Sequence, residues 1–118
     1  MKVKFLTVLN VSEISDSTWR IESDFVTQIN NDRVRVPVGF VTDFANVPRL
    51  PFAYILFGDR AHRAAVLHDY LYSIGKCKRE YADSVLKAAM QADGLGWLSR
   101  NAMWAAVRLF GGSHFIAK

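Results

Sequence analysis

The spacing of apolar residues changes once along the chain, near residue 59, and this change limits the folds open to it. Before that point apolar and polar residues alternate with a period close to two, as in strands, and after it they recur with the period of an α-helix. The alternating segments are "VKFLTVLNV", "TWRIESDFVTQI" and "RVRVPVGFV". The order predicts an α+β fold, in which a small antiparallel sheet of three or four strands is followed by three helices.

The second and third alternating segments are separated by "NND", residues 30–32. Asparagine and aspartate tolerate a positive φ and can hydrogen-bond their own backbone. We therefore expect a tight hairpin at this point.

Capping residues and glycines delimit the helices. Asp59 and Ser99 are expected to cap the first and third helices, because their side chains can accept a hydrogen bond from a free backbone N–H. A glycine beyond each helix supplies the backbone conformation that ends it. The expected helices are 59–74 before Gly75, 79–92 before Gly94, and 99–110 before Gly111 and Gly112.

Residues 42–58 are expected to form a long apolar loop between the strands and the helices. Pro48 and Pro51 exclude a regular helix there. Loops of this length are uncommon in compact domains and are often functional. Asp43 is the acid in this loop.

The chain has 118 residues, which fits a single domain with one core. The expected parts of this domain, 1–118, are the strands at 1–41, the loop at 42–58 and the helical part at 59–112. No apolar run reaches the roughly 18 residues that would span a bilayer, and the first residues turn polar too early for a signal peptide. A single cysteine, Cys77, cannot form an internal disulfide, so a cytosolic origin is expected.

The positive charge lies in the second part of the chain. Residues 49–118 carry 10 basic and 5 acidic side chains, against 5 basic and 6 acidic in residues 1–48. Such a bias favours phosphate-bearing partners, either nucleic acid or anionic lipid. Since the chain has no dense basic run and no nucleic-acid motif, we interpret the bias as a solvated basic face and predict no sequence-specific nucleic-acid binding.

Two ionisable residues fall on the apolar faces of neighbouring predicted helices. His68 shares a face with Ala64, Ala65, Leu71 and Tyr72. Asp83 lies at the edge of the corresponding stripe on the next helix. If the two helices pack antiparallel, the carboxylate can bond one imidazole nitrogen and leave the other free to take a proton from water. His68 and Asp83 are thus candidates for a general-base dyad.

Asp69 points away from this pair and is a candidate ligand for calcium, with Asp43 as a second carboxylate. The non-catalytic alternatives stay open at this point. His68 and Asp83 can be a satisfied polar pair in the core, Asp69 a solvent-facing acid, and Asp43 the cap of a turn. Tyr72 is expected to pack in the core with its phenol bonded, and Arg79 to form a surface ion pair with Asp83.

The segments "VPVGFVTDFANVP", "RAAVLHDYLY", "REYADSVLKAAM" and "AVRLFGG" occur in this order between about residue 23 and residue 112. This order resembles a family of short phage and prophage proteins described as a domain of unknown function. The resemblance implies a phage origin, and therefore a place in the host cytoplasm or the virion. It implies no activity.

A shorter resemblance concerns chemistry. "HDYLY" followed by "YADSVL" is similar to the active-site helices of type-two phospholipases A, which read H-D-x-x-Y and then A-D-x-x-F. This resemblance implies that His68 is the base, Asp83 its partner, Asp69 a calcium ligand and Tyr72 a support of the network. The glycine-rich calcium loop of those enzymes has no clear counterpart, and Gly39 and Asp43 are the nearest candidates.

Two hypotheses result. The first is a small phage-encoded hydrolase that uses calcium and a His–Asp dyad on a phospholipid or another ester. The second is a non-enzymatic phage protein that packs into a virion or binds another phage or host protein, with the same residues as a structural cluster.

Overall fold

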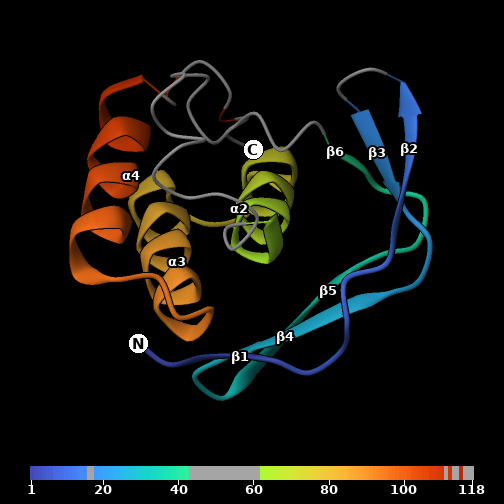
Figure 1. Cartoon of the computed structure of the whole chain (residues 1–118), viewed down its shortest axis with the longest axis horizontal. Helices are drawn as coiled ribbons and strands as arrows, with labels where there is room; N and C mark the ends of the chain where they lie inside the picture. Colours follow the sequence, from blue (N-terminus) through green and yellow to red (C-terminus); the bar gives the residue numbers. More distant parts are fainter. Residues whose placement is uncertain (16–17, 43–61, 111, 113–114, 116–118) are drawn as a thin grey trace.

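The computed structural model describes residues 1–15, 18–42, 62–110, 112 and 115 (Figure 1). Within these residues strands come first and helices follow, so the predicted α+β class is confirmed. Residues 43–58 of the predicted loop, and the predicted cap Asp59, lie outside the described residues.

The strands divide between two antiparallel sheets. The first has the order β1-β4-β5 and consists of β1 (Val3–Phe5), β4 (Phe25–Ile29) and β5 (Asp32–Val36). The second has the order β2-β3-β6 and consists of β2 (Val11–Ser15), β3 (Thr18–Ile21) and β6 (Val41–Thr42). Figure 1 shows the first sheet below the helices and the second to their right.

The segment "TWRIESDFVTQI" contributes to both sheets, as β3 and then β4. The break falls at Asp24. Its carboxylate accepts hydrogen bonds from the backbone N–H of Val38 (2.8 Å) and from the guanidinium of Arg35 (2.9 Å). These two bonds hold the junction between β3 and β4 against residues 35–38.

The predicted tight hairpin joins β4 to β5. Ile29 pairs with Asp32 across a two-residue turn, and Asn30 has a φ of 55°. Asparagine is one of the few residues that adopt this left-handed conformation at small cost. On β4, Phe25, Thr27 and Ile29 are buried and alternate with less buried residues, which is the period-two pattern expected from the sequence.

Helix α2 (His62–Ile74) lies between the second sheet and the other two helices (Figure 1). Val66 packs in a cluster with Ile21, Phe25 and Val36 of the strands. Leu67, about 100° further round the helix, belongs to a second cluster with residues of the later helices. Contacts on both sides explain why every residue from 64 to 69 is buried.

Helices α3 (Arg79–Ala92) and α4 (Trp97–Phe110) complete the fold. The last residue of α2 and both ends of α3 match the sequence prediction, and Gly75 and Gly94 have positive φ values of 60° and 86°. The start of α4 does not match, because it begins at Trp97, two residues before Ser99. The N–H of Arg100 already bonds the carbonyl of Gly96 (3.1 Å). None of the described helices is long and apolar enough to cross a membrane.

Candidate functional site

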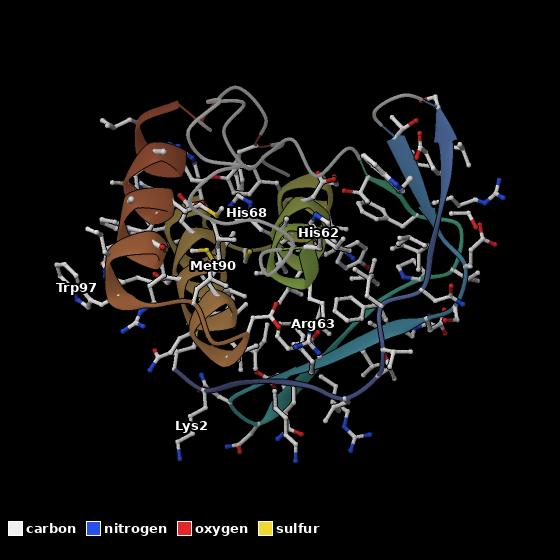
Figure 2. All side chains as sticks on the ribbon, in the orientation of Figure 1. Lys2, His62, Arg63, His68, Met90 and Trp97 are labelled. Carbon is white, nitrogen blue, oxygen red and sulfur yellow. The ribbon has the colours of Figure 1, made fainter. Side chains whose placement is uncertain are left out.

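His68 and Asp83 are hydrogen-bonded to each other across α2 and α3, as the sequence predicted. His68 Nε2 lies 2.7 Å from Asp83 Oδ1, and both side chains are fully buried. The neighbouring contact joins Tyr72 to Arg79, so residues later in α2 meet residues earlier in α3. This is the pattern of antiparallel helices. Figure 2 shows His68 in the interior of the helical part.

From the described residues, the Asp83 carboxylate accepts three close hydrogen bonds. Oδ1 accepts from His68 and from the Tyr72 hydroxyl (2.5 Å), and Oδ2 accepts from Arg108 Nη1 (2.6 Å). Burial raises the pKa of Asp83, but the hydrogen bonds from His68, Tyr72 and Arg108 outweigh it and hold that pKa below its usual value. Asp83 is therefore ionised at neutral pH.

The two nitrogens of His68 have different surroundings. An ionised carboxylate can only accept, so Nε2 carries the proton that bonds Asp83. Nδ1 is then the nitrogen with the lone pair. It is buried, and the described part of the chain provides no hydrogen-bond partner for it. Burial lowers the pKa of His68 despite the opposing effect of Asp83, so the ring is neutral near pH 7.

Tyr72 links the carboxylate to Arg79. Its hydroxyl donates to Asp83 and accepts from Arg79 Nε (3.0 Å). Its ring lies 4.1 Å from the ring of His68, between centroids, and contacts Phe115 edge-on. Burial and the neighbouring Asp83 raise the pKa of Tyr72, so the phenol keeps its proton. The expected core packing with a bonded phenol is present.

Arg79 differs from the plain surface ion pair considered for it. Its Nε is 3.9 Å from Asp83 Oδ2, and its Nη2 donates to the carbonyls of Val107 (2.7 Å) and Arg108 (3.0 Å). These carbonyls are in the last turn of α4 and have no partner within the helix. Arg79 therefore links the C-terminal end of α4 to the N-terminal end of α3 through hydrogen bonds.

Arg108 is the member of the cluster that the sequence reasoning missed. It extends from α4 to Asp83, and its Nη2 lies 3.5 Å from Glu80. The one signal in the sequence was an arginine in the last turn of a predicted helix. Such residues usually interact with the carbonyl end of their own helix, so the position did not indicate a contact with α3.

Asp69 is buried and bonded, so the solvent-facing alternative is wrong. The Thr42 hydroxyl of β6 donates to Asp69 Oδ2 at 2.6 Å. Asp43 lies outside the described residues, and among the described residues no group of three or more histidine, cysteine or acidic side chains is close enough to hold a metal ion. Gly39 lies in the turn between β5 and β6, has a φ of 92° and donates its N–H to the Ile21 carbonyl (2.8 Å).

The sequence model of one protein family matches residues 19–107, and that family is described as "Protein of unknown function (DUF1353)". The matched region contains His68, Asp69, Tyr72 and Asp83 and ends one residue before Arg108. No curated protein and no solved structure matches the chain.

Proposed function

The chain belongs to the family described as "Protein of unknown function (DUF1353)", and we propose that it is a hydrolase in which His68 activates water for attack on an ester. The proposal rests on one observation, the buried Nδ1 of His68 without a hydrogen-bond partner among the described residues. Leaving a buried acceptor unpaired costs roughly 1–3 kcal/mol. A histidine with a purely structural role would be expected to use both nitrogens.

The contacts around His68 suit a general base. Asp83 fixes the tautomer in which Nδ1 has the lone pair, and Arg108 and Tyr72 keep Asp83 ionised. Nδ1 would take a proton from water while the oxygen attacks the ester carbonyl. The resulting imidazolium is stabilised by Asp83, and it then returns the proton to the alkoxide that leaves. His68, Tyr72 and Asp83 are the residues that the resemblance to type-two phospholipases A assigns to this network.

Calcium is part of the proposal, with Asp69 and Asp43 as its ligands. The carboxylate of Asp69 and the hydroxyl of Thr42 are oxygen donors, which suit a hard cation, and Asp43 follows Thr42 directly in the sequence. Bound calcium would supply positive charge for the oxyanion formed at the ester carbonyl. A phospholipid substrate, a phage origin and a place in the virion or the host cytoplasm are proposed from the resemblances alone.

The direct test is the release of fatty acid from phosphatidylglycerol vesicles in calcium. His68→Gln should lower the rate by roughly 100-fold or more, the usual scale for loss of a general base. His62→Gln is the matched control, because His62 is an exposed histidine on the same helix. Wild-type protein without hydrolysis on any ester tested, or a His68→Gln protein that is fully active, would overturn the proposal.

A second function is favoured by the complete burial of His68 and Asp83. The cluster joins all three described helices, which is what a structural clamp would do. In that case the protein would be a non-enzymatic virion component or a binder of a phage or host protein. The wild type would show no hydrolysis, and substitution of His68 would reduce stability alone.

A further inference from the structure

The outward side of α4 exposes large apolar side chains. Trp97 is 68% exposed, Leu98 71% and Leu109 75%. At 100° per residue, Leu98, Ala105 and Leu109 fall within an arc of about 40°, with Trp97 about 100° round from Leu98. We call Trp97, Leu98, Ala105 and Leu109 the α4 face. Figure 2 shows Trp97 projecting away from the rest of the molecule.

The core does not need the α4 face. The buried residues of α4, Met103 and Val107, lie on its other side and belong to the core cluster shared with α2 and α3. Figure 1 shows α4 at the outer edge of the helical part, with α3 between it and α2. Several large exposed apolar side chains on one helix mark a candidate interaction site.

The charges near the α4 face are mostly positive. The helix itself contains Arg100 and Arg108 and no acidic residue, but the charge of Arg108 is already paired with the buried Asp83. Lys87 of α3 adds a third cation, with its Nζ 5.0 Å from the ring centre of Trp104. The nearby acid Glu80 lies against Arg108. A helix with an exposed Trp and leucines on one side and basic residues beside them is the pattern that binds anionic membrane surfaces.

We propose that the α4 face docks the protein on the surface of an anionic lipid bilayer, with Trp97, Leu98 and Leu109 entering the headgroup region. A second copy of the chain is a poorer partner. A stable dimer buries about 800 Å² and roughly 20–30 residues on each subunit, far more than the four residues of the α4 face. Pairing two α4 faces would also bring like charges together. The proposed binding does not depend on the hydrolysis proposed above.

The test is co-flotation of the full chain with vesicles in a calcium-free buffer, so that hydrolysis plays no part. Vesicles of phosphatidylcholine with phosphatidylglycerol are compared with vesicles of phosphatidylcholine alone. The protein should bind the anionic vesicles much more strongly, and added salt should weaken binding.

The variant Trp97→Ser/Leu98→Ser/Leu109→Ser should lose binding by roughly 1,000-fold, at about tenfold for each of the three side chains removed from lipid. The matched control is Val8→Ser/Val38→Ser/Val41→Ser. These three valines are also exposed, lie outside α4, and should leave binding unchanged.

Three results would overturn the proposal. One is equal binding to neutral and anionic vesicles, and another is unchanged binding by the α4 triple variant. The third is no vesicle binding at all, including the case in which sedimentation shows a wild-type dimer that the triple variant dissociates.

Discussion

Arg108 Nη1 lies 2.6 Å from Asp83 Oδ2, so among the described residues the last turn of α4 supplies the nearest full positive charge to a carboxylate buried between α2 and α3. The closest alternative, Arg79 Nε, is 3.9 Å from the same oxygen. The neutrality of the core therefore depends on a residue 25 positions further along the chain.

Arg108→Gln should lower the free energy of unfolding by about 3 kcal/mol, because it leaves the buried charge of Asp83 without its main partner. Urea denaturation measures this. Arg35→Gln is the control, since it breaks an exposed ion pair with Asp24 and should leave stability almost unchanged. Equal effects of the two substitutions would mean that the Arg108–Asp83 contact contributes little.

Stability should fall as the pH is lowered below about 6.5. The pKa of His68 is lowered from its ordinary 6.5 by burial, so between its folded and unfolded values the unfolded state binds more protons. The stabilisation is complete above about pH 6.5 and is lost as the pH falls through the folded pKa. Below about pH 4 the protonation of Asp83, whose pKa is lowered in the folded state, should reduce stability further. Melting temperatures measured from pH 8 to pH 5 test this. In His68→Gln the melting temperature should change less with pH.

Tyr72→Phe should cost about 1–2 kcal/mol, because the hydroxyl both donates to Asp83 and accepts from Arg79. If the proposed hydrolysis exists, its rate should fall less than in His68→Gln, since Asp83 keeps its bonds to His68 and Arg108. Tyr70→Phe is the control, because the contact of Tyr70 with Phe40 is through its ring. A Tyr72→Phe protein as stable as wild type would exclude a role for this hydroxyl.

Calcium should raise the melting temperature by mass action, and Asp69→Asn should remove that rise. Asp32→Asn, in the exposed hairpin between β4 and β5, should leave the calcium effect intact. The measurement is a calcium titration of the melting temperature with magnesium as a second cation. A calcium-dependent rise of the same size in Asp69→Asn would show that Asp69 is not a calcium ligand.

The C-terminal ends of α2 and α3 and the hairpin were predictable because local chemistry decides them. Gly75 and Gly94 end their helices through backbone conformations that few other residues adopt, and Asn30 does the same in the turn. The predicted start of α4 at Ser99 is wrong, because the helix begins at Trp97 and glycine, here Gly96, is also accepted at the position before a helix.

The pairing of His68 with Asp83 was also predictable, since helical spacing placed each residue on a face that had to meet the other. The burial of Asp69 and the contact of Arg108 were not. Asp69 is buried because α2 is enclosed on two sides, and periodicity within one helix cannot reveal a second neighbour. Arg108 acts through its contact with another helix, which leaves no pattern in its own segment.

The dependence of Asp83 on Arg108 has a consequence for the order of events on the ribosome. Synthesis completes α2 and α3 before Arg108 is added to the chain. Until then the Asp83 carboxylate would be buried between those helices without Arg108, and an unpaired charge is costly in an apolar interior. We therefore expect the helical part to become stable late in translation, when α4 emerges, rather than one helix at a time.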